Sequence, residues 1–350
     1  MENNTTLFDS GGIESEGALV LKDSIISNNK AQGTGGGVMN DRGALTLDDS
    51  AVENNVADEG GVYNQATLNV TNHTLIIGNQ ATEDARNAVA AHGGGGLNNS
   101  GSTGDTVAAT ISDSYIVGNT APLTSGSGVF NNIKLIVTNS MIANNSSSLG
   151  GGLYDINDDA QAQIHNSCLM GNQVENEALA GSGSGIQNDA EPAVDIPHGG
   201  GGINNATENS QVTISDSFVI GNHGDKTTGG GIFNSATLTV THSVLADNIS
   251  GAGGALYNDF GGQGSISGSC IMQNKVLLVT PAGLGSGIES AMNLFDASKN
   301  WWGAASGPGP FGPGSGDSVT RNMTFNDFLK TPPDIYSGAV PTPYPTPPAP

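Results

Sequence analysis

The sequence predicts an all-β protein built as a solenoid, a parallel β-helix of about ten coils. Glycine is abundant, at 53 of 350 residues, while 12% of residues are charged and 36% are apolar. This composition suits neither a disordered chain nor a typical compact domain. Two short phrases alternate along the chain at intervals of roughly 23 to 35 residues, the range expected of solenoids. Apolar residues recur at spacing two within short runs, which indicates β-strands.

The first phrase reads Gly, aliphatic, any residue, Asn. Clear copies begin at Gly37, Gly61, Gly128 and Gly231, and looser copies begin at Gly12, Gly96, Gly152, Gly185, Gly202, Ala255 and Gly287. The glycine runs before these copies predict tight corners of the coil, because glycine adopts backbone conformations that other residues avoid. They lack the Lys-Ser or Lys-Thr that follows a phosphate-binding loop.

The second phrase reads Ser or Thr, any residue, aliphatic, two residues, Asn. It ends at Asn29, Asn55, Asn79, Asn119, Asn145, Asn172, Asn222, Asn248 and Asn274. In a stacked coil, equivalent residues lie about 4.8 Å apart along the axis, so these side chains would form an inward hydrogen-bonded ladder. A turn-forming role alone would admit Gly or Asp about as often as Asn, and Asn at every one of these places favours the ladder.

Alternating segments rich in β-branched residues lie between the phrases, for example residues 44–49, 211–217 and 236–242. Such segments are typical of strands and a poor fit to helix. Each unit therefore supplies about three short strands. No unit can bury its apolar face alone, so the units must stack in register.

Residues 50–55 set the orientation of the second phrase. An unpaired Glu53 cannot lie in a coil interior, so Val52 points inward while Ala51 and Glu53 point outward. The same alternation predicts an apolar row on the outside, called here the outer stripe: Tyr115, Val117, Met141, Cys168, Met170, Phe218, Ile220, Val244, Cys270 and Met272.

The outer stripe would exceed the few hundred Å² of apolar surface that monomers normally expose, so it requires cover. A second copy of the chain is the leading expectation. The alternatives are an intrachain cover, from residues 174–185 or from the segment around Phe325, Phe328 and Leu329, and a ligand or host surface. Because equivalent positions at least two coils apart are separated by about 14 Å or more, Cys168 and Cys270 are expected to be free thiols.

A second outward line is formed by the third residue of the first phrase: Met39, Tyr63, Phe130, Tyr154, Phe233 and Tyr257. We expect its aromatic rings to stack between coils. Sugar binding is the alternative role for such a line.

The repeated phrases and the stretch "NWWGAASGPGP" from Asn300 resemble a family of secreted bacterial right-handed parallel β-helix proteins with adhesin-like or polymorphic outer-membrane-type repeats. The resemblance runs from about residue 11 to 333. It implies a right-handed coil, an extracellular or cell-surface location, and an open end covered by Trp301 and Trp302. We accordingly expect coils over 1–303, a cap or last coil over 304–336, and a proline-rich linker or tail over 337–350 that is extended.

The formal charge of −23 predicts no binding to nucleic acid and no direct insertion into membranes, since phosphates and anionic lipids are repelled. Acidic clusters lack accompanying basic residues, because Arg42, Arg86 and Arg321 are the only arginines. Polysaccharide cleavage through a basic residue is therefore disfavoured. A neutral-glycan hydrolase needs only two carboxylates about 5 to 10 Å apart, and that class stays open.

Calcium is the one cofactor for which the sequence offers a weak candidate. Asp155, Asn157 and Asp159 begin like a calcium-binding loop, but the glycine and the final glutamate of that motif are missing. The sequence thus predicts a non-enzymatic structural or adhesive rod at a cell surface, which associates with itself through the outer stripe. A carbohydrate-active enzyme or a glycan-binding module is the alternative.

Overall fold

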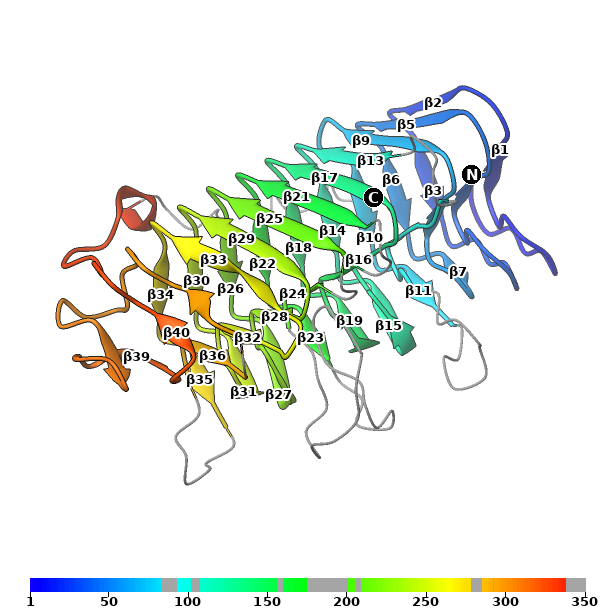
Figure 1. The fold of residues 1–350 in the computed structure, drawn as a ribbon. Coiled ribbons are helices and arrows are strands. Elements are labelled where there is room, and N and C mark those ends of the chain that lie inside the picture. The colour runs from blue at the N-terminus through cyan, green and yellow to red at the C-terminus, as the bar shows by residue number, and fades with distance from the viewer. Residues whose placement is uncertain are drawn as a thin grey trace.

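The computed structural model describes residues 1–82, 93–101, 108–155, 160–174, 201–205, 209–277, 285–291 and 293–337. Within them the chain forms the predicted parallel β-helix, an elongated stack of coils that follow one another in chain order (Figure 1). Four parallel sheets run along the stack, named here in the order in which one coil visits them.

Sheet 1 contains, in spatial order, β1 (Ile13–Ser15), β4 (Val38–Asn40), β8 (Val62–Asn64), β12 (Leu97–Asn99), β16 (Val129–Asn131), β20 (Leu153–Asp155), β24 (Ile203–Asn205), β28 (Ile232–Asn234), β32 (Leu256–Asn258), β36 (Ile288–Ser290), β39 (Gly316–Val319) and β38 (Pro308–Pro310). Sheet 2 contains β2 (Leu19–Lys22), β5 (Ala44–Asp48), β9 (Thr67–Thr71), β13 (Ala108–Ser112), β17 (Lys134–Thr138), β21 (Gln161–His165), β25 (Gln211–Ser215), β29 (Thr237–Thr241), β33 (Gln263–Ser267), β37 (Phe295–Asp296) and β40 (Met323–Thr324).

Sheet 3 contains β3 (Ile25–Ser27), β6 (Ala51–Glu53), β10 (Leu75–Ile77), β14 (Tyr115–Val117), β18 (Met141–Ala143), β22 (Cys168–Met170), β26 (Phe218–Ile220), β30 (Val244–Ala246) and β34 (Cys270–Met272). Sheet 4 contains β7 (Val56–Ala57), β11 (Gln80–Ala81), β15 (Thr120–Ser125), β19 (Ser146–Leu149), β23 (Gln173–Val174), β27 (His223–Thr228), β31 (Ile249–Ala252) and β35 (Lys275–Val276). A 3-10 helix, η1 (Asp334–Ser337), follows the last strand.

The described residues contain ten successive coils, each beginning with a strand of sheet 1 from β1 to β36. This number agrees with the predicted one of about ten. The prediction of about three strands per coil was wrong, because the residues after each ladder asparagine from Asn55 to Asn274 form a fourth sheet. Strands such as β7 and β11 are two residues long. They carry no apolar alternation that a sequence pattern could reveal.

The core is a set of aliphatic ladders inside the coil. Val52 is fully buried between the half-exposed Ala51 and Glu53, so the predicted orientation of the second phrase is correct. Ile76 and Ile116 follow in register on the neighbouring strands, also fully buried. Each strand of sheet 2 from β5 to β29 adds two buried residues, such as Leu135 and Val137 in β17.

The asparagines of the second phrase form the predicted ladder. All nine are buried, and each amide nitrogen from Asn29 to Asn248 donates to the amide oxygen of the next asparagine at 3.0 to 3.1 Å. The ladder ends on a carboxylate, since the side chain of Asn274 donates to Asp317 at 2.7 Å. The residue before each ladder asparagine has a positive φ, for example Asn54 and Gly78, which Asn and Gly tolerate best.

Two further ladders strengthen the stack. In the first phrase, the amide of Asn40 donates to Asn64, and Asn64 to Asn99, at 2.7 and 2.8 Å. In the second phrase, the Ser or Thr hydroxyl accepts from the backbone N–H of its counterpart in the preceding coil, as Ser140 does from Ser114. Sequence reasoning missed this hydroxyl ladder, although the recurring Ser or Thr was its signal.

The C-terminal end of the stack departs partly from the prediction. Trp302 is fully buried in the core cluster, which also contains Val319 of β39 and Met323 of β40. Trp301 does not cover the end: it pairs with Cys270 and lies on the outer side of sheet 3. The reason is that consecutive residues of an extended chain face opposite sides. Residues 338–350, most of the predicted tail, lie outside the described residues.

Candidate functional site

The outer face of sheet 3 is the principal candidate surface, and its side chains gather as the sequence predicted. They form two apolar clusters that are separate from the core. One cluster contains Met141, Ala143 and Cys168, with Tyr115, Met170 and Phe218 packed against it. The other contains Val244, Ala246, Cys270 and Met272, with Phe218, Ile220, Trp301 and Ile335 packed against it. Phe218 belongs to both, so the outer stripe is continuous along the rod.

The outer stripe is less exposed in the single chain than the sequence suggested. Six of its ten residues are buried: Val117, Met141, Cys168, Val244, Cys270 and Met272. The other four, Tyr115, Met170, Phe218 and Ile220, are half-buried. Part of the cover is intrachain, because Ile335 of η1 packs on the stripe. The segment around Phe325 and Phe328 does not provide this cover, since both rings pack on the core at the end of the stack.

Both cysteines lie within the outer stripe and are free thiols, as expected. Burial raises the pKa of each thiol to about 12. A thiol with this pKa holds its proton at neutral pH, and the protonated form is a weak nucleophile. The two groups are therefore poor candidates for catalysis but good reporters of whether the stripe is covered.

The second outward line, formed by the third residue of the first phrase, lies on the outer side of sheet 1. The expected stacking of its aromatic rings between coils occurs there. The rings of Phe130 and Tyr154 stack at 5.6 Å between centroids, and those of Phe233 and Tyr257 at 5.8 Å. Asn204 lies between these two pairs in register. Its side-chain amide is fully buried, and neither of its polar atoms has a hydrogen-bond partner.

A carboxyl group with unusual properties lies at the C-terminal end of this line. Glu289 is the register partner of Tyr257, and burial raises the pKa of Glu289 to about 7. Burial also raises the pKa of the Tyr257 hydroxyl, and the negative charges of Asp259 and Glu289 contribute to this shift. A glutamic acid whose pKa is raised toward neutrality by burial is a feature of general acid catalysis.

The calcium candidate is contradicted at Asp155. This residue takes the place of asparagine in the ladder of the first phrase, where it is fully buried and accepts from Asn131 at 2.5 Å. Burial raises the pKa of Asp155 to about 8, so it is mainly a neutral acid at neutral pH and not a surface ligand for Ca²⁺. Asn157 and Asp159 lie outside the described residues. Among the residues described, no group of three or more His, Cys, Asp or Glu side chains could hold a metal ion.

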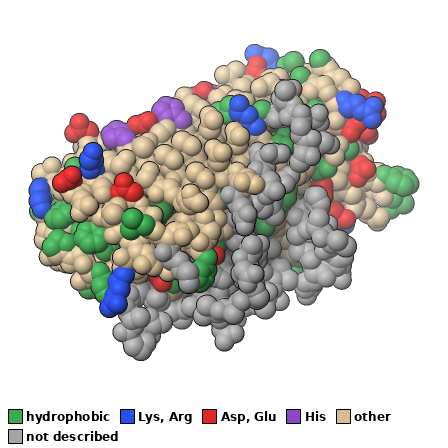
Figure 2. Space-filling model, viewed as in Figure 1, with side chains coloured by type: hydrophobic (Ala, Val, Ile, Leu, Met, Phe, Trp, Pro, Cys, Tyr) green, Lys and Arg blue, Asp and Glu red, His purple; other side chains and the backbone are tan. Residues whose placement is uncertain are grey.

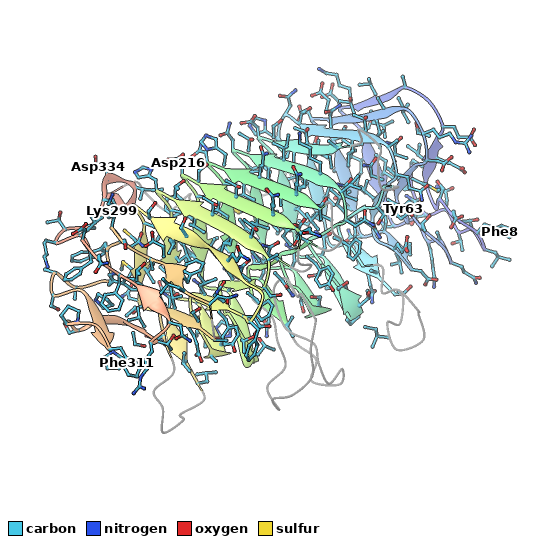
Figure 3. The ribbon with its side chains drawn as sticks, viewed as in Figure 1. Phe8, Tyr63, Asp216, Lys299, Phe311 and Asp334 are labelled. Carbon is cyan, nitrogen blue, oxygen red and sulfur yellow. The ribbon has the colours of Figure 1, made fainter. Side chains whose placement is uncertain are left out.

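An exposed polar cluster occupies the corner between sheets 2 and 3. Asp216 contacts His242 at 2.6 Å and His165 at 3.4 Å. Figure 2 shows histidine and acidic side chains along one edge of the rod, and Figure 3 labels Asp216 there. Exposed ion pairs of this kind contribute at most about 1 kcal/mol to stability.

Comparisons with protein-family models, with curated proteins and with solved structures each found no match. The family resemblance of the repeats therefore stays a prediction. In the part of the chain that is described, no helix has the length and apolar character needed to cross a bilayer.

Proposed function

We propose that this chain is a non-enzymatic structural or adhesive rod at an extracellular or cell surface. The observation that supports the proposal is the unbroken asparagine ladder, which runs from Asn29 to Asn274 and ends on Asp317. Coil after coil repeats the same buried amide, and each amide holds its coil on the next. A stiff, long stack therefore explains most of the repeated sequence. At one strand spacing of about 4.8 Å per coil, ten coils span roughly 50 Å.

Lateral pairing through the outer stripe is the finer form of this proposal. Tyr115, Met170, Phe218 and Ile220 are half-buried, and they lie in two neighbouring register rows on the outside of sheet 3, Tyr115 with Phe218 and Met170 with Ile220. Electron microscopy and sedimentation over a concentration series test pairing. Paired rods or filaments that disappear after Tyr115→Thr with Phe218→Thr would support it, and single rods at every concentration would refute it.

A glycan-cleaving role is the second candidate, supported by Glu289, because burial raises the pKa of this carboxyl group to about 7, in the range of a general acid. The test is incubation with neutral and acidic polysaccharides, read as bound glycan and as new reducing ends. Cleavage that is present in the parent chain and lost in Glu289→Gln would favour this role over the rod.

A further inference from the structure

A segment outside the repeats closes the C-terminal end of the coil stack. This end segment, residues 302–324, contains Trp302, β38, β39 and β40, and Figure 1 shows β39 and β40 at that end of the stack. Its Trp302, Val319 and Met323 belong to the same core cluster as the aliphatic ladders of the coils. The attachment of the end segment therefore decides whether the core is closed at this end.

Strand pairing joins the end segment to the stack more sparsely than it joins the coils to one another. β25 and β29 pair at all five positions, whereas β39 pairs with β36 at one position, Val319 with Ile288. Among the described residues, the strands of sheets 3 and 4 end at β34 and β35, so the end segment adds no strand to either sheet. A unit with few pairs to its neighbours opens at a low free energy, so the end segment can open while the coils stay folded.

One carboxylate joins the end segment to the asparagine ladder. Within the stack, a ladder asparagine such as Asn248 donates from its backbone N–H and from its Nδ2 to Oδ1 of Asn274, both at 3.0 Å. At Asn274 the same two donors reach Oδ2 of Asp317, at 3.1 and 2.7 Å. The backbone N–H of Asp317 in turn donates to the carbonyl oxygen of Trp302 at 2.8 Å. Asp317 therefore takes the place of the next ladder asparagine and differs from it in being titratable.

The surroundings of Asp317 favour its neutral form while the end segment is closed. Burial is the main cause, and the negative charge of Asp247, at the corner between β30 and β31, acts in the same direction. The N–H groups of Asn274 and Gln273 oppose the shift, and the pKa of Asp317 is raised from 3.8 to about 6. When the segment opens, water reaches the carboxyl group and its pKa returns to the ordinary value. The closed state therefore holds a proton that the open state releases.

Two other charged residues lie on the neighbouring strands. Lys275 of β35 follows the last ladder asparagine, and its side chain is exposed. Glu289 of β36 has different partners, because its carboxyl group accepts from the backbone N–H groups of Gly253 and Gly285. Neither residue holds the end segment, and Asp317 is the titratable group at the junction.

We infer that the end segment is a pH-sensitive latch on the coil stack, closed at acidic pH and loosened as pH rises, with Asp317 as its titrating group. Because the pKa of Asp317 is about 6 in the closed state and 3.8 in the open state, the equilibrium constant for closure should fall about ten-fold from pH 5 to pH 8. Nε1 of Trp302 also weakens closure, since it is buried without a hydrogen-bond partner among the described residues and such a group is costly. The latch does not depend on the proposed function.

Hydrogen exchange at single-residue resolution in the full-length chain tests the latch. The reporters are the backbone N–H groups of Asn274 and Gly287, which donate to Asp317 and to the carbonyl oxygen of Ser318. After correction for the intrinsic pH dependence of exchange, we expect their protection to fall about ten-fold from pH 5 to pH 8 and to level off above about pH 7. The N–H of Asn55, which donates to Asn79 far from the end segment, should keep its protection.

Three results in the parent chain would overturn the latch. They are constant protection of the two reporters, an equal fall at Asn55, which would report unfolding of the whole chain, and a fall that begins only above pH 7, which would assign the titration to another group.

Asp317→Asn assigns the effect to this residue. Asparagine keeps the acceptor of the ladder but does not titrate, so reporter protection should change less than about two-fold from pH 5 to pH 8. Asp296→Asn is the matched control, since Asp296 accepts from Thr324 of the end segment at 2.8 Å. A hydrogen bond from Ser298 lowers the pKa of Asp296, so it stays ionised over this range and its variant should retain the ten-fold fall. A full fall in Asp317→Asn, or its loss in Asp296→Asn, would refute the assignment.

Discussion

Asn145 illustrates how one buried side chain joins three coils. Its amide nitrogen donates to the carbonyl oxygen of Ile116 in the preceding coil at 3.1 Å and to Oδ1 of Asn172 in the following coil at 3.0 Å. Its own Oδ1 accepts from the backbone N–H and from the amide of Asn119, both at 3.0 Å. The position therefore needs a donor and an acceptor on a side chain of this length, which asparagine supplies.

Asn145→Ala should destabilise the rod strongly. The substitution leaves two donors of Asn119 and the buried acceptors around position 145 without partners, and each such group costs about 1 to 3 kcal/mol. We expect a loss of roughly 3 kcal/mol or more, measured by urea unfolding. Asn144→Gly is the control, since residue 144 is exposed with φ of 53° and glycine adopts that conformation freely. Equal stability of the two variants would contradict the ladder's energetic role.

Asp155→Asn should stabilise the chain and remove a pH dependence. The pKa of Asp155 is raised from 3.8 to about 8 in the folded chain, so the folded state holds a proton that the unfolded state releases. Its contribution to stability is therefore fully present below about pH 4 and is lost as pH rises through 8. We expect the parent chain to lose about 2 to 3 kcal/mol between pH 6 and pH 8 from this group.

Unfolding by urea at pH 6 and pH 8 measures that difference. The asparagine variant should show a smaller loss, because an amide does not titrate between these pH values. It should also be the more stable protein at pH 8, since its amide can donate to Asn205, the next residue in register. Equal pH dependence in both proteins would mean that Asp155 is ionised in the folded chain at both pH values.

Residue-level prediction succeeded where the repeat itself carried the information. Nine asparagines at one place predicted a ladder, and the single charge of Glu53 was enough to orient the outer stripe. Asp155 was misread because an acidic turn and a ladder position have the same local sequence. Only the stacking partner, Asn131, distinguishes them.

At the level of the individual strand, the choice of residues is also limited by the close approach of neighbouring backbones at the coil corners. A Cβ atom on Gly128 would collide with the carbonyl oxygen of Gly152 and would lie 2.9 Å from Nδ2 of Asn145. This explains why the first phrase begins with glycine. Ala255 holds the same place in its own coil and is fully buried there, so the end of the stack tolerates one more carbon.

Gly128→Val should destabilise β16 and its neighbours by about 3 kcal/mol or more, because overpacking here displaces backbone and not a flexible side chain. Ala255→Gly is the control at the equivalent place, with an expected cost near 1 kcal/mol from lost packing and added chain entropy. Thermal unfolding followed by circular dichroism measures both. A smaller loss at Gly128 than at Ala255 would contradict the close-approach argument.

Strand-level prediction was limited by the apolar alternation that each strand carries. Strands of sheet 2 from β5 to β33 span five residues and alternate clearly, so the sequence located them. Sheet 4 was missed because its strands carry no apolar alternation, whether they have two residues, as in β7, or six, as in β15. The orientation of Trp301 was missed because its coil has no second phrase to align with. The cover over the outer stripe could not be deduced, since it depends on where η1 meets the stack.

At the scale of the whole rod, charge and buried acids should make stability fall with rising pH. Burial raises the pKa of Asp317 to about 6 and that of Glu289 to about 7. Both groups therefore contribute stability at acidic pH that is lost as pH rises through these values. The formal charge of −23 adds repulsion along the whole length, and this repulsion is long-ranged at low salt, with a screening length of about 30 Å at 0.01 M.

Salt concentration separates the two causes of the fall in stability with rising pH, which are surface repulsion and the ionisation of buried acids. Raising NaCl from about 0.01 to 0.5 M at pH 8 should raise the unfolding temperature by a few degrees, because surface repulsion is screened while buried acids are not. At high salt a decrease in unfolding temperature from pH 5 to pH 9 should remain, owing to Asp317 and Glu289 together with Asp155. Calorimetry at three pH values and two salt concentrations tests both parts. A pH dependence that vanished in high salt would assign the whole effect to surface charge and would argue against neutral acids inside the rod.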